Sequence, residues 1–169
     1  LFSLPIRREA VLWGKGISLF VIGSIQLIVF FVYGELVFRV GLFQQPLTLA
    51  VLIVTWVAVA ASFAMMLATT CRSAKQAEGL ATILILVMSA LGGCWFPTQL
   101  MSLPGWLESA TRIVPTYWAM TGFQGMMWNQ LTLGSPKVLG AISIQWLFVA
   151  LLSAFSVIMF RRNYCRDLA

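Results

Sequence analysis

Long windows without a charged side chain constrain this sequence more than any other feature. Four of them, each rich in Leu, Ile, Val, Phe and Ala, cover residues 16–34, 40–71, 79–107 and 138–160. A helix needs about 20 apolar residues to cross the hydrocarbon core of a bilayer, and each window is long enough. Only 9% of the 169 residues are charged, whereas about 25% are charged in soluble domains. The sequence therefore predicts an all-α membrane protein, a polytopic helical bundle.

Within a single transmembrane domain over residues 1–169, we expect four membrane-spanning helices near residues 17–37, 47–68, 77–96 and 141–160. A fifth charge-free window, residues 113–136, differs because Pro, Gly, Gln and Asn interrupt it. Backbone of this kind is tolerated at membrane depth only where protein buries it. We interpret the connection over residues 97–137 as two short external, re-entrant helices near residues 104–113 and 116–129.

Basic residues are distributed unevenly between the two sides of such a bundle. Eight of the 11 fall with the N-terminal segment, the turn at residues 71–78 and the tail at residues 161–169, namely Arg7, Arg8, Lys15, Arg72, Lys75, Arg161, Arg162 and Arg166. Short loops rich in Lys and Arg stay in the cytoplasm. We therefore expect a multi-pass protein of the cell membrane, plasma or inner, with both termini cytoplasmic.

Missing residue types exclude several functions. The sequence has no His and three widely spaced Cys, which excludes His-based metal sites and Ser-His-Asp catalysis. No charged residue lies in the middle of a predicted span. A proton relay or an ion-coupled transporter would therefore lack the intramembrane charged side chains on which it depends. We expect no enzymatic activity, no metal ion and no binding of nucleic acid.

A few polar side chains in or beside the spans are candidates for function. Glu35 and Arg39 are four residues apart on a predicted helix, which favours an interfacial ion pair and leaves a gating or substrate role as the alternative. Other polar groups lie mid-span, where they either hydrogen-bond between helices or line a polar pathway: Gln26, Thr55, Ser62, Ser89 and Gln145.

Two shorter segments also invite an interpretation. Gly92 and Gly93, near the outer end of the third span, indicate either close helix packing or a hinge. Residues 4–15 read as a short amphipathic cytoplasmic helix, within the segment 1–15, that either anchors in the membrane interface or docks a partner. Its first turn and its charged head are formed by Pro5, Arg7, Arg8 and Glu9.

Five short stretches follow one another along the chain: Leu-Pro-Ile-Arg-Arg at 4–8 with Gly-Lys at 14–15, Lys-Gln-Ala at 75–77, Leu-Gly-Gly-Cys-Trp-Phe-Pro at 91–97, Pro-Gly-Trp-Leu at 104–107 and Pro-Thr-Tyr-Trp at 115–118. In this order they resemble the C-terminal half of an ABC transporter permease of the type-2 exporter superfamily. A basic pair, Arg161 and Arg162, follows the last span. The likeness covers nearly the whole chain.

This resemblance implies a permease with six spans, of which the first two are missing here and the last four are present. It implies that two permeases pair as a homodimer or heterodimer, and that each rests on a cytosolic ABC ATPase through residues 4–15. Pro5, Arg7, Arg8 and Glu9 are then the candidate ATPase contacts. The ATPase would bind ATP and Mg, so no cofactor is expected in this chain, which has no Gly-x-x-x-x-Gly-Lys-[Ser/Thr] phosphate loop.

The same resemblance implies that the connection between the last two spans closes the outer mouth of a substrate pathway. The candidate gate residues are Gly92, Gly93, Pro97, Pro104, Trp106, Pro115, Tyr117 and Trp118. The predicted function is a lipid-embedded permease subunit of an ATP-driven exporter. The alternative is a secondary transporter or channel subunit of another polytopic family, for which intramembrane charges or paired broken helices would be typical.

Overall fold

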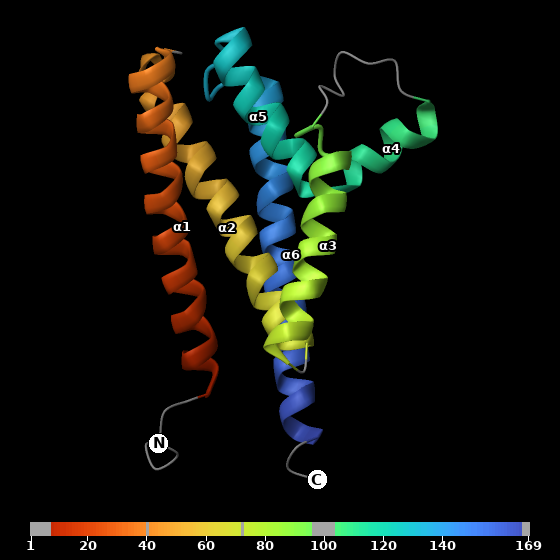
Figure 1. Ribbon diagram of the computed structural model, residues 1–169. Helices are drawn as coiled ribbons and strands as arrows, with labels where there is room; N and C mark the ends of the chain where they lie inside the picture. Colours follow the sequence, from red (N-terminus) through yellow and green to blue (C-terminus); the bar gives the residue numbers. More distant parts are fainter. Residues whose placement is uncertain (1–7, 40, 72, 96–103, 167–169) are drawn as a thin grey trace.

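The computed structural model describes residues 8–39, 41–71, 73–95 and 104–166, and within these ranges it is helical without strands (Figure 1). The elements are α1 (Arg8–Phe38), the short 3-10 helix η1 (Leu42–Gln44), α2 (Pro46–Thr70), α3 (Ala74–Leu91), α4 (Gly105–Ile113), α5 (Pro115–Asn129) and α6 (Pro136–Arg166). Four segments are long and apolar enough to cross a membrane: Trp13–Phe38, Pro46–Thr70, Ala74–Leu91 and Pro136–Arg162. The predicted fold class is therefore confirmed.

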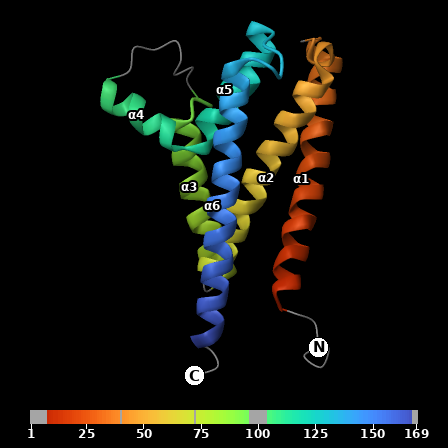
Figure 2. The ribbon, with the colours of Figure 1, turned by 180° about the vertical axis from the view of Figure 1, so that it is seen from behind.

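Along the chain the four long helices alternate in direction (Figures 1 and 2). α1 and α3 rise from the end where α6 finishes, whereas α2 and α6 both descend and pack side by side in parallel (Figures 1 and 2). α1 and α3 flank this central pair on opposite sides (Figure 1). The first turn of α1 and the last turn of α6 consequently lie at the same end of the molecule.

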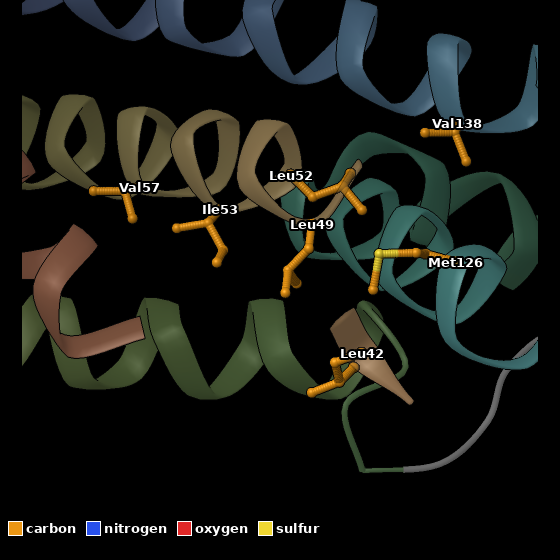
Figure 3. Close-up of a cluster of buried hydrophobic side chains, with 7 residues drawn as sticks. All are labelled: Leu42, Leu49, Leu52, Ile53, Val57, Met126 and Val138. Atoms are coloured by element: carbon orange, nitrogen blue, oxygen red, sulfur yellow. The ribbon is translucent and has the colours of Figure 1, made fainter. Parts of the chain in front are cut away.

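α2 is the central helix of the bundle. It packs against α1, α3, α5 and α6, and its buried residues run from Thr48 to Thr69. Near the end that carries α5, seven buried side chains gather from four elements (Figure 3), namely Leu42, Leu49, Leu52, Ile53, Val57, Met126 and Val138. No residue of α3, by contrast, is buried.

α4 and α5 form an elbow beside the upper part of the bundle. α4 descends toward the end of α3, and α5 then climbs along α6 to the end of the bundle that carries η1 (Figure 1). The bend follows from Val114, which has extended backbone, and from Pro115, which opens α5. Proline suits the first turn of a helix because the N–H it lacks has no partner there. The two helices lie where the sequence predicted two short ones.

Two expected boundaries differ from the structure. A separate coupling helix was expected over residues 1–15, but α1 runs unbroken from Arg8 to Phe38. No proline interrupts this stretch, and its glycines keep helical backbone, so the helix continues straight into the first candidate span. The part of the expected helix before Arg8 lies outside the described residues.

The third span was expected to reach residue 96, but α3 ends at Leu91. Gly93 has a left-handed backbone with φ of 82°, and Cys94 N–H donates to Ser89 O at 3.1 Å while Gly93 N–H donates to Ala90 O at 3.5 Å. This pair of hydrogen bonds is a Schellman motif, in which glycine accommodates the reversed φ at the end of a helix. The Gly-Gly pair therefore ends the helix.

Candidate functional site

Some of the residues expected to form an outer gate, among them Gly92 and Pro115, lie at the junction of α3 with the α4–α5 elbow. Thr116 Oγ1 donates a hydrogen bond to Met88 O near the end of α3. Gly92, which is buried, lies against Thr116 so closely that a Cβ at position 92 would collide with the threonine hydroxyl. The first turn of α5 is thus fixed on the last turn of α3. Neither Thr116 nor Met88 was among the candidate gate residues, although Thr116 belongs to the Pro-Thr-Tyr-Trp stretch.

The elbow itself is held by contacts within and between its two arms. Trp118 Nε1 donates to Arg112 O at 2.8 Å, so the indole of α5 binds the last turn of α4. Tyr117 packs edge-on against Trp118, with ring centroids 5.4 Å apart. On α4, Arg112 and Glu108 form an exposed ion pair at 2.6 Å. These contacts hold α4 and α5 in a fixed arrangement.

Not all of the expected gate residues take part in this junction. Pro115 is buried at the bend, while Pro104 precedes α4 and is exposed. Trp106 lies away from the bundle with 75% of its surface exposed. Gly93 has the left-handed backbone that follows the end of α3. Pro97 lies outside the described residues.

Cys94 follows the end of α3, beside the candidate gate, and the residue taken as a whole is exposed. Partial burial of its thiol nevertheless raises the pKa of Cys94 above the ordinary value of a thiol. Within the described ranges no three Cys, Asp or Glu side chains gather, so no residue set is assigned to a metal ion.

Glu35 has a different partner from the one expected. Its Oε2 accepts a hydrogen bond of 2.8 Å from the backbone N–H of Leu42, and among the described residues it forms no ion pair with Arg39. Arg39 has left the helix with a left-handed φ of 50°, so the helical spacing that would bring the two side chains together ends before it. The carboxylate instead fastens the turn between α1 and α2.

A second connection joins α2 to α5 at the same end. Gln45 Nε2 donates to Gln130 O at 2.8 Å, and Gln45 Oε1 accepts from Thr48 Oγ1. Gln130 ends α5 with a left-handed φ of 49°. The sequence offered no signal for this pairing because the two residues are 85 positions apart.

A seam of polar side chains runs between the parallel helices α2 and α6. Ser62 Oγ lies 3.2 Å from Ser153 Oγ, and Thr69 Oγ1 lies 3.3 Å from Ser156 Oγ. Thr55, Ser62 and Thr69 recur every seven residues and therefore share one face of α2. These hydroxyl pairs are hydrogen bonds between helices, which is one of the two roles expected for Ser62.

Gln145, on the same helix as these serines, is 1% exposed, and its Oε1 has no hydrogen-bond partner. The other mid-span amide, Gln26, is exposed on α1. The structure therefore separates two residues that the sequence treated alike. One amide lies inside the bundle, and the other faces its surroundings.

Two of the candidate ATPase contacts, Arg8 and Glu9, lie at the opposite end from the elbow. Arg8 and Glu9 begin α1, while Pro5 and Arg7 precede the described residues. The starts of α1 and α3 and the last turns of α6 lie at this end (Figure 1), and these segments carry the exposed residues Lys15, Lys75 and Arg162.

Comparison with known proteins gives one match. The model of the family described as ABC-2 type transporter matches residues 1–128. That range contains α1 to α4 and nearly all of α5. No curated protein and no solved structure matches the chain.

Proposed function

Because this chain belongs to the ABC-2 type transporter family, we propose that it is the permease subunit of an ATP-driven exporter. Membership of this family makes the chain a multi-pass ABC transporter permease. The proposal adds the direction of transport, its energy source and the partner proteins. The observation that carries the proposal is the family match, which extends over 128 of 169 residues and includes three of the four candidate spans.

In this proposal, two permeases form the substrate pathway, and each docks on a cytosolic ABC ATPase. The end that carries Lys15, Lys75 and Arg162 faces the cytoplasm, and the elbow of α4 and α5 faces outward. Arg7, Arg8 and Glu9 would register the docking interface, since charges at the rim of an interface steer and orient the partner. ATP and Mg belong to the ATPase.

Charge reversal tests the coupling assignment. The double variant Arg7→Glu with Arg8→Glu is co-expressed with the ABC ATPase encoded in the same gene cluster or the same polypeptide. We expect the variant permease to insert at normal yield while co-purification of the ATPase and ATP-dependent transport are both lost. A matched control, Arg72→Glu with Lys75→Glu, reverses one charge between α2 and α3 and one in the first turn of α3, and should leave both intact.

Three outcomes would count against the proposal. Normal ATPase binding and transport by the Arg7/Arg8 variant would return residues 4–15 to a lipid anchor, which predicts weaker binding to anionic lipid instead. Equal losses of ATPase binding and transport in the control variant would mean that the change in overall charge causes them, and not the positions of Arg7 and Arg8. Transport that persists without any ATPase would favour a secondary transporter.

A further inference from the structure

A buried amide inside the bundle lacks a hydrogen-bond partner. Gln145 of α6 is 1% exposed, and its Oε1 accepts no hydrogen bond among the described residues. The burial comes from this chain alone, so further spans or a second permease beside the bundle would not alter it. Buried polar side-chain atoms are almost always paired, either with a protein group or with an ordered water molecule. Gln145 Oε1 therefore requires a donor inside the bundle.

The packing of α2 against α6 places Thr55 at the level of this amide. Two hydroxyl pairs join the helices, and their members are 91 and 87 positions apart, namely Ser62 with Ser153 and Thr69 with Ser156. Because α2 and α6 are parallel (Figure 1), the part of α6 beside Thr55 lies a similar number of positions beyond it, between residues 142 and 146. Gln145 falls in this range.

A second contact gives the same register. A Cβ at Gly122 of α5 would lie 2.8 Å from the Leu52 side chain and 3.8 Å from the Ala141 Cβ, so Leu52 and Ala141 belong to one layer of the bundle. Thr55 follows Leu52 by three residues, and Gln145 follows Ala141 by four, which keeps each residue on the same face of its helix. Thr55 and Gln145, each 1% exposed, therefore lie in the next layer between α2 and α6.

Small residues on α5 leave space in this layer. α5 runs antiparallel to α6, and Gly122 is level with Ala141. The next buried residue of α5 toward its first turn is Ala119, and it therefore lies at the level of Gln145. A buried water molecule needs room as well as polar partners. A methyl group beside a long amide leaves room that a larger side chain would fill.

The two polar side chains of the layer present acceptors to each other. Thr55 Oγ1 donates its single proton to Val51 O at 2.7 Å, which leaves lone pairs for any further hydrogen bond. Gln145 Oε1 is an acceptor as well. Two acceptors cannot bind each other, so the molecule that joins them must carry two donors. Water is the smallest molecule of this kind, and buried waters typically make about two to four hydrogen bonds to otherwise unpaired groups.

We propose that one water molecule binds between Thr55 and Gln145 and links α2 to α6 inside the bundle. One O–H of the water donates to Gln145 Oε1, and the other donates to Thr55 Oγ1. The bridge is a third connection along the seam that the two hydroxyl pairs form. It does not depend on the proposed exporter function, since it needs neither ATP nor an ATPase.

Reversible unfolding of the full chain in mixed detergent micelles measures the link. Thr55→Val keeps the size of the side chain but removes its hydroxyl. It should raise the equilibrium constant for unfolding about three- to tenfold, as the loss of one hydrogen bond predicts. Gln145→Met removes the amide, so in that background Thr55→Val should change the constant by less than about twofold.

Thr82→Val is the matched control for the loss of a hydroxyl from a helix. The Thr82 hydroxyl also donates to the carbonyl four residues earlier, at 2.9 Å to Glu78 O, but it lies on an exposed position of α3. Its removal should have a small effect that is the same with and without Gln145→Met. Insertion yield and helix content are measured for every variant, so that a folding defect is recognised.

Water-edited solid-state NMR of the full chain in lipid nanodiscs identifies the bridging molecule. Magnetisation that starts on water protons should reach the side-chain amide of Gln145 faster than it reaches the buried backbone amides of α2. In Thr55→Val the transfer to the Gln145 amide should become slower. The measurement on the unaltered chain tests the proposal even where a variant does not insert.

Two results would overturn the proposal. Slow transfer from water to Gln145 in the unaltered chain, together with coupled stability effects, would mean that the amide is turned and its Nε2 donates directly to Thr55 Oγ1. Additive effects of Thr55→Val and Gln145→Met on unfolding would mean that nothing joins the two side chains.

Discussion

At the residue scale, the contact between Gly92 and Thr116 is the most demanding feature of the candidate gate. A Cβ at position 92 would collide with the Thr116 hydroxyl and would lie 2.8 Å from Met88 O. Overpacking of this kind typically costs about 1–3 kcal/mol. We therefore expect Gly92→Ala to separate the first turn of α5 from α3 and to lower the unfolding temperature of the purified protein in detergent.

Gly79→Ala is the matched control for this prediction, because it makes the same change inside α3, the helix that Gly92 follows, with nothing within 4 Å of the new Cβ. Alanine favours a helix more than glycine does by about 1 kcal/mol, so the control should be neutral or stabilising. A Gly92→Ala protein as stable as the Gly79→Ala protein would show that the α3–α5 contact is not tight.

Glu35 shows what a sequence can and cannot reveal about a single residue. Its place near the end of a span could be predicted, because charges mark where an apolar window stops. Its partner could not be, because that partner is the backbone N–H of Leu42, seven residues away across a turn. The turn depends on left-handed backbone at Arg39 and Gly41. Only glycine signals that conformation in a sequence.

At the scale of elements, α4 is a short amphipathic helix that contacts little besides α5. Trp106 and Ile113 lie on one face, 75% and 71% exposed, and Glu108 with Arg112 lies on the other. Such a helix is expected to lie in the membrane interface with its apolar face toward the acyl chains. A nitroxide label at Ile113→Cys should therefore be quenched by oxygen, and one at Glu108→Cys by a water-soluble nickel complex.

The Glu108→Cys label is the internal control, since the two positions belong to the same two-turn helix and differ only in face. Removal of the exposed Glu108–Arg112 pair should cost no more than about 1 kcal/mol. If water-soluble nickel quenches both labels equally, α4 projects into water, and the interpretation of the elbow as a membrane-inserted structure is wrong.

The elements most readily predicted were those marked by strong local signals. Pro115 divided the apolar window of residues 113–136 from the helix before it, and both arms of the elbow could be placed from the sequence. The end of α3 was misplaced by five residues because the apolar run continues through Trp95 and Phe96. Backbone conformation at Gly93 ends the helix despite that run, and the Gly-Gly pair was the available signal.

At the scale of the whole molecule, hydrophobic windows predicted the number of long helices but not how they pack. Gln26 and Gln145 have the same chemistry and similar places in their spans, so the sequence assigned them the same roles. In the bundle, α6 lies on α2 and buries Gln145, whereas Gln26 is exposed on α1. Which face of a uniformly apolar helix meets its neighbour depends on tertiary packing, and no periodic polar stripe records it.

Membrane topology is the prediction that most directly tests this arrangement. Cys71 and Cys94 lie beyond opposite ends of α3, one in the turn after α2 and the other after the last turn. The uneven distribution of Lys and Arg predicts that the α2–α3 turn is cytoplasmic and the elbow external. In variants that retain only one cysteine, a membrane-impermeant maleimide should label Cys94 in intact cells and Cys71 only after permeabilisation.

The rate of labelling adds a control for the chemistry. Maleimides react with the thiolate, and partial burial raises the pKa of Cys94, so less thiolate is present at neutral pH than in an ordinary thiol. Labelling of Cys94 should therefore be slower than that of an unstructured peptide thiol and should accelerate as the pH rises toward that pKa. Absence of label at neutral pH alone would thus not place Cys94 inside. Labelling of Cys71 but not Cys94 in intact cells at alkaline pH would reverse the predicted topology. It would also move the proposed ATPase interface to the end that carries the elbow.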